Sequence, residues 1–322
     1  MRSVQVLRTT GPADVVVRDA PEPAPGPDDV LVEVHAVGVS FPDLLLSKGE
    51  YQLKPEVPFT LGVDFAGMVV SGPDGFEPGQ RVAGVGGYGG AAELVANPAM
   101  FTFALPDEMS YDEGAALPMN YLTAQFALVE RGRLQAGETV LVHGAAGGVG
   151  TATLQVAKGY GARTIAVVST PEKAEVAKAA GADETVLLDG FKDAVKDLTG
   201  GSGVDVVLDV VGGDAFTDSL RLLSTQGRLL VVGFAAGQGI PEVQVNRLLL
   251  NNVDVRGVGW GAYAMVRPGY MQQQWAELLP MMGSGVLKPP IGATYDLDGF
   301  GAALLDMDAR KTLGKSVVRV RG

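Results

Sequence analysis

Val140-Leu-Val-His-Gly-Ala-Ala-Gly-Gly-Val-Gly150 is the most informative segment of the sequence: an apolar strand runs into a glycine-rich turn, and a helical segment follows. Gly147 and Gly148 let the backbone approach a pyrophosphate closely, and Gly150 allows tight packing of helix on strand. The N-terminus of such a helix offers free N–H groups and a positive dipole end to an anion. Ala145 replaces the first glycine of the usual G-x-G-x-x-G pattern. The strand before and the helix after still favour a dinucleotide site over a turn that binds no ligand.

From Thr139 onward, apolar strands alternate with helical segments. This alternation predicts a parallel, doubly wound sheet and places this part of the chain in the α/β class. The expected strands are Thr139–His143, Thr164–Val168, Thr185–Leu188, Val206–Val210, Leu229–Gly233 and Val253–Val258, with helices at Val149–Gly159 and Pro171–Ala180.

Before Met119 the pattern is different. Short apolar runs bounded by Gly or Pro predict a β-rich domain, an antiparallel and partly open barrel. The expected strands here are Val4–Leu7, Val15–Arg18, Val30–Val39, Gly67–Ser71, Arg81–Val85 and Ala91–Val95. From about Leu287 the tail is expected to form a strand, a short helix and a strand that pack back onto this first domain.

The composition excludes several classes of function. The 322 residues include no Cys and only two His, His35 and His143. Disulfides and thiol catalysis are therefore impossible, and no metal site is expected, since zinc sites are rich in His or Cys. A net charge of −12 argues against nucleic acid as a partner. No apolar run approaches membrane-spanning length and the N-terminus lacks an apolar signal core, so we expect a cytoplasmic protein without a membrane partner.

The end of the second strand of the sheet selects between the nicotinamide cofactors. NAD-dependent enzymes place Asp or Glu there to bind the ribose hydroxyls. Here Ser169 takes that place, and Lys173 follows one helical turn later. A hydroxyl and an ammonium attract the 2′-phosphate that a carboxylate would repel, so these residues favour NADPH. In the alternative interpretation, Thr170 and Pro171 only begin a helix and Lys173 is a solvated side chain.

Segments spread over nearly the whole chain resemble the medium-chain dehydrogenase/reductase superfamily, in its zinc-independent quinone oxidoreductase branch. These segments are Ala36–Asp43, Leu61–Gly67, Leu122–Ala124, Val140–Gly150, Ser169–Lys173, Gly181–Asp183, Gly227–Gly233 and Gly314–Ser316. The resemblance implies a GroES-like catalytic domain of residues 1–122, completed by residues 285–322. It also implies a Rossmann domain of residues 123–284, NADPH in a cleft between the domains, and a homodimer that pairs edge strands of the Rossmann sheets.

The resemblance also implies roles for single residues. For the cofactor these are Ala146, Gly147, Gly148 and Val149 at the pyrophosphate, Ser169 and Lys173 at the 2′-phosphate, Thr123 beside the nicotinamide, Val232, Gly233 and Phe234 at the nicotinamide ribose, and Gly259, Trp260 and Gly261 in a later cofactor-lining segment. Tyr51 matches an active-site tyrosine. Two positions depart from the family: Ser40 stands where relatives often have Asn, and Leu187-Leu-Asp-Gly190 lacks the Tyr or His that relatives often carry near the 2′-phosphate.

The expected reaction is hydride transfer from NADPH to a quinone or to the activated C=C bond of an α,β-unsaturated carbonyl compound. The hydroxyls of Tyr51 and Ser40 are the candidate donors to the oxygen on which negative charge develops. Either Tyr51 or water could supply the proton, and packing of Tyr51 on the nicotinamide is an equally weighted alternative. Two other functions stay open: reduction of an enoyl thioester such as an enoyl-CoA, and a non-catalytic role as an NADPH-binding accessory protein.

Several further polar and aromatic residues have structural roles as their first expectation. His35 and His143 are expected to be packed rather than catalytic. Asp43 is expected to cap the helix that starts at Phe41-Pro42, with orientation of Ser40 or Tyr51 as the alternative. The remaining expectations are that Asp64 anchors backbone or a nearby base, and that Trp260 and Tyr263 line either the substrate cleft or an interface.

Overall fold

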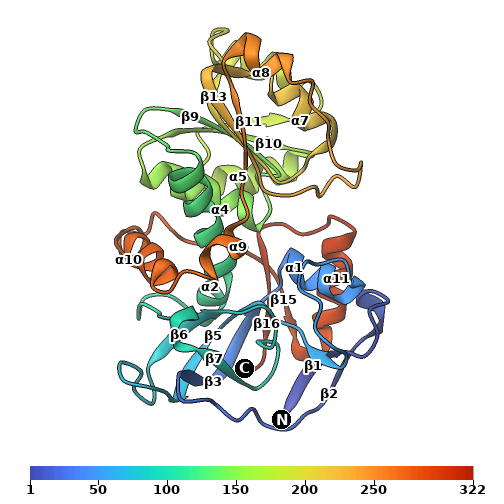
Figure 1. Ribbon diagram of the computed structural model, residues 1–322, viewed down its shortest axis with the longest axis vertical. Helices are drawn as coiled ribbons and strands as arrows, with labels where there is room; N and C mark the ends of the chain where they lie inside the picture. The colour runs from blue at the N-terminus through green and yellow to red at the C-terminus, as the bar shows by residue number, and fades with distance from the viewer. Residues whose placement is uncertain (322) are drawn as a thin grey trace. The chain divides into compact units, whose positions relative to one another are not determined.

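The computed structural model describes residues 1–321, which belong to two compact units (Figure 1). The first unit comprises Met1–Met119, Pro268–Ala276 and Ile291–Gly322, and the second comprises Asn120–Arg267 and Glu277–Pro290. Against the expected boundaries, the main difference is Pro268–Ala276, which joins the first unit. Trp275 explains this placement, because its ring stacks on Phe103 at 4.8 Å and its Nε1 donates to the Ala104 carbonyl at 3.0 Å. Within the part of the chain that the structure describes, no helix has the length and apolar character to cross a membrane.

The second unit is built on a six-stranded sheet in which every neighbouring pair is parallel. The strand order is β11-β10-β9-β12-β13-β14, and the first strand along the chain, β9, lies inside the sheet. The bounds are Thr139–His143 (β9), Arg163–Val168 (β10), Glu184–Leu187 (β11), Val204–Asp209 (β12), Leu223–Val231 (β13) and Asp254–Gly257 (β14). The predicted α/β class and doubly wound parallel sheet are therefore confirmed.

Helices connect these strands, as a parallel sheet requires. They are Gly148–Gly159 (α4), Pro171–Ala179 (α5), Phe191–Leu198 (α6), Gly213–Ser219 (α7), Asn246–Asn251 (α8) and Trp260–Ala264 (α9), followed by Tyr270–Gly283 (α10). Leu141, Ile165 and Val207 have no exposed surface. They lie in one apolar cluster with Phe191 of α6 and Phe216 of α7. Strands buried on both faces explain why their sequences are continuous apolar runs.

The first unit contains two sheets whose strands are mostly antiparallel. Arg2–Val6 (β1), Val15–Asp19 (β2) and Phe59–Thr60 (β4) form one sheet in the order β2-β1-β4. The seven-stranded sheet has the order β15-β16-β3-β5-β6-β8, and β7 pairs with β3 beside this path. Its bounds are Asp29–Gly38 (β3), Asp64–Ser71 (β5), Arg81–Val85 (β6), Leu94–Pro98 (β7), Thr102–Ala104 (β8), Ile291–Asp296 (β15) and Lys315–Arg319 (β16).

The chain's tail belongs to the first unit. It forms β15, the helix Phe300–Asp308 (α11) and β16, and β16 pairs antiparallel with β3. One expected strand was misplaced: β7 begins at Leu94 rather than at Ala91. Instead, the Ala91 carbonyl accepts from the Val4 amide and the Ala91 amide donates to the Leu61 carbonyl, which draws Ala91 toward the small sheet.

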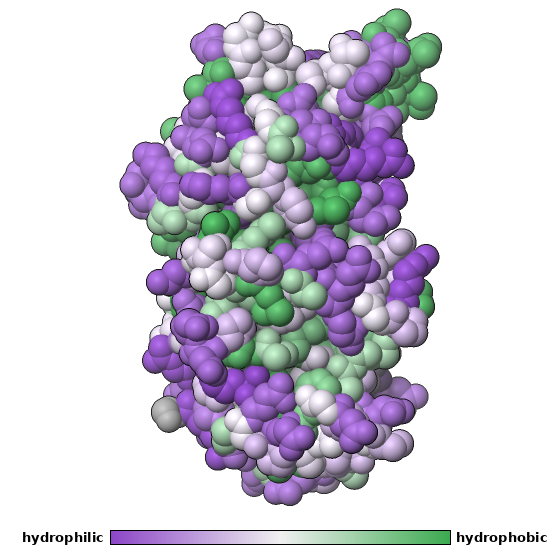
Figure 2. Space-filling view, turned by 90° about the vertical axis from the view of Figure 1, so that its left-hand side faces the viewer, coloured by the Kyte–Doolittle hydropathy of each residue, from purple (hydrophilic) through white to green (hydrophobic). Residues whose placement is uncertain are grey.

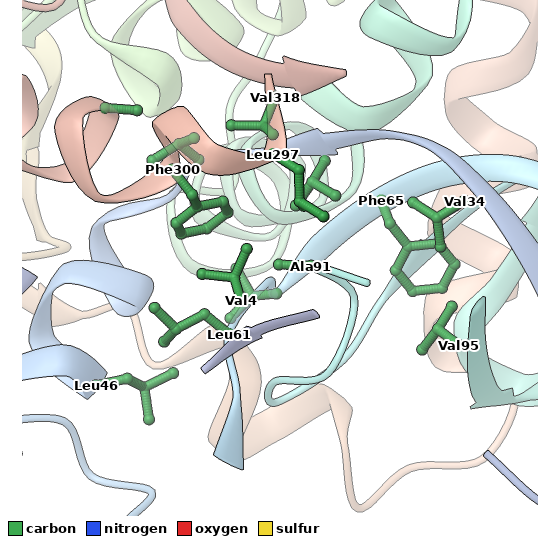
Figure 3. Packing of buried hydrophobic residues seen from close by; sticks show 14 of the residues in the cluster. Val4, Val34, Leu46, Leu61, Phe65, Ala91, Val95, Leu297, Phe300 and Val318 are labelled. Carbon is green, nitrogen blue, oxygen red and sulfur yellow. The ribbon is translucent and has the colours of Figure 1, made fainter. Parts of the chain in front are cut away.

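The core of the first unit lies between its sheets and helices. Figure 3 shows Val34, Phe65 and Val95 grouped at one end of this apolar cluster and Val4, Leu46, Leu61 and Phe300 grouped at the other. The other helices of the unit are Phe41–Lys48 (α1) and Tyr111–Ala116 (α2), and the short 3-10 turns are Pro12–Asp14 (η1), Ala99–Phe101 (η2) and Leu297–Gly299 (η5).

Candidate active site

The glycine-rich turn of the second unit connects β9 directly to α4. A Cβ on Gly150 would lie 2.3 Å from the Gly144 carbonyl oxygen and 2.7 Å from Ala145 Cα, so a side chain there would collide with backbone. Gly147 is the N-cap of α4, which leaves the amides of Gly148, Val149 and Gly150 without intrahelical acceptors. The turn therefore presents a row of donors at a positive helix end, as an anion-binding site requires.

Asn120, which the sequence did not point to, lies against this turn. Its side chain is 6% exposed, and a Cβ on Gly148 would lie 2.7 Å from Asn120 Nδ2. The amide group of Asn120 thus lies directly against the start of α4. Gly148 is needed for this approach as well as for access to the backbone.

Asn120 belongs to an irregular helical stretch that also carries Thr123. The short α-helix Thr123–Gln125 (α3) lies between two π-helical segments, Pro118–Leu122 (η3) and Phe126–Arg131 (η4). Such π-bulges are frequent at functional sites. Thr123 itself is buried, at 7% exposure.

Ser169 and Lys173 lie together at the carboxyl end of β10. Lys173 Nζ donates to Ser169 Oγ at 3.2 Å, and Thr170 caps α5 by accepting from the Lys173 amide. The helix-start role of Thr170 and the pairing of Ser169 with Lys173 thus occur together rather than as alternatives. At the end of β11 the chain continues as Leu187-Leu-Asp-Gly190, so this segment adds no aromatic or basic side chain to the pair.

The loops after β12 and β13 are joined through Asp209. Its backbone carbonyl accepts from Val232 at 2.8 Å, and its Oδ1 accepts from the amides of Val211 and Gly212 at 2.8 and 2.9 Å. Asp209 is fully buried. The residues expected at the nicotinamide ribose are Val232, Gly233 and Phe234, which directly follow β13. The hydrogen bond to Asp209 therefore fixes the start of this segment.

The later segment Gly259–Gly261 begins α9. Gly259 is its N-cap, and Trp260 is only 4% exposed. Tyr263 packs against Phe126, with ring centroids 5.1 Å apart, and against the guanidinium of Arg267. Within the second unit both aromatics therefore have packing roles.

His143 is a packed residue, as expected. It has no exposed surface, its Nε2 lies 2.7 Å from Ser219 Oγ, and its ring meets Phe191 edge to face. Burial lowers its pKa to about 4 against the opposing charge of Asp209, so the imidazole is neutral at pH 7. His35 likewise stacks on Tyr111, at 4.3 Å.

Ser40 of the first unit lies in a buried polar cluster with Asp43, Asp64 and Lys315. Ser40 Oγ donates to Asp64 Oδ2 at 2.8 Å, and Lys315 Nζ donates to both of these oxygens, at 2.6 Å to Ser40 and 2.8 Å to Asp64. Asp64 Oδ1 accepts from the Met119 amide at 2.8 Å. The expectation that Asp64 anchors backbone and a base is confirmed, and the base is Lys315, which the sequence did not single out.

Asp43 caps α1, as expected. Its Oδ2 accepts from the Ser40 amide at 3.0 Å, and its Oδ1 accepts from the Gly62 amide at 2.8 Å. Burial raises the pKa of Asp43 to about 7, and the nearby charge of Asp64 adds to this shift. The two backbone hydrogen bonds and the charge of Lys315 act in the opposite direction.

Tyr51 differs from Ser40 in the hydrogen bonding of its hydroxyl. Among residues 1–321 the Tyr51 hydroxyl makes no hydrogen bond, whereas the Ser40 proton is held by Asp64. Burial first, and then the charge of Asp43, raises the pKa of Tyr51. The phenol is therefore available as a hydrogen-bond donor, and it keeps its proton to a higher pH than an ordinary tyrosine.

The titration of Asp43 leads to a stability prediction. A folded-state pKa near 7 lies above the unfolded value, so the stability from protonated Asp43 is present at low pH and lost as pH rises through 7. His143 has the opposite sign, because its folded pKa is lowered and its contribution is lost as pH falls through about 6.5 to 4. Titration of Asp43 should lower the free energy of unfolding by about 2 kcal/mol between pH 5 and pH 7, and we expect this decrease to be absent in Asp43→Asn.

The measurement is urea unfolding of the first unit at pH 5, 6 and 7, followed by Trp275 fluorescence in a Trp260→Phe background. Only the pH slope is compared, because Asp43→Asn also weakens a cap at every pH. A His143→Phe variant, changed in the other unit, serves as the control. Parallel curves for Asp43→Asn and its background would contradict the assignment.

Among the residues that the structure describes, no three or more His, Cys, Asp or Glu side chains are grouped so that they could hold a metal ion. The carboxylate oxygens of Asp43 and Asp64 already accept hydrogen bonds from backbone amides, a hydroxyl and an ammonium.

Comparisons with known proteins cover both units. Two family models match: the alcohol dehydrogenase GroES-like domain over residues 26–107 and the zinc-binding dehydrogenase over residues 148–284. Quinone oxidoreductase-like protein 2 of Rattus norvegicus is 39% identical over 308 residues, which cover 94% of this chain and 87% of that protein.

Two solved structures have the same fold along nearly their whole length. A probable oxidoreductase from Mycobacterium abscessus is 43% identical, with a TM-score of 0.90, and the match covers 99% of this chain and 98% of that one. The mycobacterial protein Rv1454c in complex with NADPH is 33% identical, with a TM-score of 0.90, over 99% of each chain.

Proposed function

The chain belongs to the medium-chain dehydrogenase/reductase family, in its quinone oxidoreductase branch, and on that premise we propose that it reduces a quinone or an activated C=C bond by hydride transfer. It is an oxidoreductase, and its cofactor is NADPH. The observation that carries the proposal is the Ser169–Lys173 pair, which lies at the carboxyl end of β10, the strand that pairs with β9.

The residues present fit the phosphate groups of NADPH. The free amides at the start of α4, with Ala146 and Gly147 before them, would hold the pyrophosphate, and Ser169 and Lys173 would hold the 2′-phosphate. Thr123, Val232–Phe234 and Gly259–Gly261 would line the rest of the cofactor. When bound, NADPH supplies the hydride.

The first unit would supply the donor to the acceptor's oxygen. Negative charge develops on that oxygen as the hydride arrives, and a hydrogen-bond donor lowers the barrier. Tyr51 suits this role because its hydroxyl is half-buried and uncommitted. Ser40 has its proton on Asp64 and would have to turn away from that carboxylate to donate.

An assay with several acceptors identifies the class of compound that the enzyme reduces. We expect comparable kcat/KM values for small quinones and enones, and lower values for enoyl-CoA, because no basic cluster for the CoA phosphates stands out. NADPH oxidation followed by absorbance with each acceptor measures this. A clear preference for enoyl-CoA would support the enoyl thioester alternative, and NADPH binding without turnover of any acceptor would support the accessory-protein alternative.

Lys173→Ala tests the 2′-phosphate contact. Loss of one charge-assisted contact is expected to raise the Kd of NADPH about 10- to 100-fold and to leave the Kd of NADH unchanged. Cofactor fluorescence titration measures both constants. Lys178→Ala is the matched control, since Lys178 lies on the same helix and pairs with Glu175. Equal weakening of both cofactors, or of neither, would contradict the proposal.

The proposal includes a homodimer of this chain. β14 is the edge strand of the parallel sheet and follows α8 directly. Leu248 of α8 packs against the core, whereas Ile240, Val245, Leu249 and Leu250 are each more than 70% exposed. Figure 2 shows an apolar surface patch at the end where α8 lies in Figure 1. A second copy that pairs along β14 would cover these side chains by two-fold symmetry.

Leu249→Glu is expected to convert the dimer to a monomer, because each copy would place a charge in an apolar contact. Light scattering coupled to size exclusion measures the mass. Val70→Glu, which changes an exposed apolar residue of the first unit, should leave the dimer intact. A monomeric wild-type protein, or a dimeric Leu249→Glu variant, would refute this part of the proposal.

A cytoplasmic location and independence from zinc belong to the same proposal. Independence from zinc rests on composition, since the chain has no Cys and two His.

A further inference from the structure

Lys315 is an ammonium group buried inside the first unit. Its side chain is 5% exposed, and that of its partner Asp64 is fully buried. A Cβ on Gly38 would lie 2.7 Å from Lys315 Cε, so the lysine stem passes directly along β3. Removing an ammonium and a carboxylate from water has a large desolvation cost, so such a pair adds little net stability. Its position beside Ser40 therefore calls for a functional explanation.

The hydrogen bonds at Ser40 define the direction of proton flow. An ionised carboxylate only accepts and an ammonium only donates, so Ser40 Oγ must donate to Asp64 and accept from Lys315. The hydroxyl is thus held between a proton source and a proton acceptor. If it turns toward another acceptor, Asp64 keeps two partners, the Lys315 ammonium and the Met119 amide.

Tyr51 can donate a hydrogen bond to the acceptor, but it does not explain where the proton that completes the reduction comes from. Burial and the neighbouring charge of Asp43 make loss of the phenolic proton harder, although the hydroxyl remains a good hydrogen-bond donor. The same Asp43 accepts from the Ser40 amide, so Ser40 and Tyr51 share this neighbour.

We propose that Lys315 supplies, through the hydroxyl of Ser40, the proton that completes the reduction. The inference rests on the proposed function. After the acceptor has gained the hydride and its two electrons, its oxygen carries the negative charge. The O–H bond of Ser40 breaks and its proton bonds to that oxygen, while an N–H bond of Lys315 breaks and its proton passes to Ser40 Oγ. Lys315 is left briefly as a neutral amine, while the buried Asp64 carboxylate keeps the Met119 amide. A hydronium ion from the solvent then reprotonates Lys315 and restores the ion pair, and an enol product converts to the carbonyl compound in solution.

In this scheme Ser40 touches the acceptor and Lys315 acts through it as a positioning and proton-supplying residue. A purely structural role for Lys315 would be to hold β16, β5 and the start of α1 together. The two roles separate in variants that keep the ion pair but break the relay.

Two such variants are available. Ser40→Ala removes the hydroxyl and leaves the direct contact of Lys315 with Asp64. Lys315→Arg keeps the positive charge beside Asp64, but a guanidinium cannot be deprotonated in a protein. Ser40→Thr, which restores a hydroxyl, is the matched rescue variant. Thermal unfolding and the Kd of NADPH, from fluorescence titration, report on fold and cofactor site independently of activity.

The experiment measures kcat with the acceptor that the wild-type enzyme reduces fastest, at increasing concentrations of imidazolium buffer. Ser40→Ala and Lys315→Arg are expected to lower kcat about 100-fold, with the Kd of NADPH within twofold of wild type. Their kcat should rise with buffer acid, because the proton must then come from solution. The wild-type enzyme and Ser40→Thr should be fast and insensitive to buffer acid.

The outcomes distinguish this inference from the proposed function. If the wild-type enzyme turns over and both Ser40→Ala and Lys315→Arg have a kcat within threefold of wild type, the proton relay is wrong and the proposed function still stands. A Ser40→Thr variant as slow as Ser40→Ala, or slow variants that buffer acid does not accelerate, would overturn the relay equally. A wild-type enzyme that reduces no acceptor would overturn the proposed function and the relay with it.

Discussion

Gly150→Val is expected to abolish NADPH binding by the second unit. A Cβ at this position would lie 2.3 Å from the Gly144 carbonyl oxygen and 2.7 Å from Ala145 Cα. Both are backbone atoms of the turn, so α4 must move away from the turn that its free amides complete. Overpacking of this kind costs about 1–3 kcal/mol of stability. Displacement of the donors should raise the Kd of NADPH at least about 100-fold, because several contacts of about 1 kcal/mol or more are lost together.

Fluorescence titration with NADPH and thermal unfolding measure the two effects. Gly283→Ala is the control, because a Cβ there meets no atom within 4 Å and the residue lies in the helical end of α10. Its Kd and its unfolding temperature should match those of the wild-type protein. A Gly150→Val protein that binds NADPH within a few-fold of wild type would show that the turn does not hold the cofactor.

Lys315→Met is expected to destabilise the first unit by about 3–5 kcal/mol. The substitution leaves Asp64 fully buried without its cation, and breaking a buried pair from one side has this cost. Urea unfolding followed by Trp275 fluorescence in the Trp260→Phe background measures the change.

Two comparisons make this prediction specific. Lys311→Met removes a lysine that is 72% exposed and 3.8 Å from Asp306, and it should cost less than about 1 kcal/mol. In the Asp64→Asn background, Lys315→Met should cost much less than it does alone, since no buried charge is left unpaired. Equal losses in both backgrounds would mean that the two side chains do not act as a pair.

The sheet of the second unit was predictable because its strands are buried on both faces. Leu141, Ile165 and Leu229 belong to continuous apolar runs that stand out between polar helices, and the glycine-rich turn marks where the first strand ends. The predicted strand bounds agree with the structure to within a few residues, apart from Leu223, where β13 begins earlier.

Other features depend on contacts between distant residues and were missed for that reason. Ala91 looks like a strand residue, but its pairing with Val4 and Leu61 is set by the small sheet. The stacking of Trp275 on Phe103, which assigns Pro268–Ala276 to the first unit, joins residues far apart in sequence.

The candidate site was predictable only in part for the same reason. The turn and the Ser169–Lys173 pair are local, and their residues were found from spacing. Lys315 and Ser40 are separated by 275 positions, so their contact leaves only a weak signal: a lysine that opens an apolar strand. Asn120 lies in a π-helical segment, which has no distinct sequence pattern, so its approach to Gly148 could not be foreseen.

Oxidation of NADPH and of NADH, followed by absorbance with a simple quinone and a simple enone as acceptors, tests the reaction and the cofactor together. We expect steady oxidation of NADPH that depends on both the enzyme and an acceptor, with NADH used at least about tenfold less efficiently, because one phosphate contact is missing. Tight binding of NADPH with no oxidation by any acceptor, or equal use of the two cofactors, would contradict this expectation.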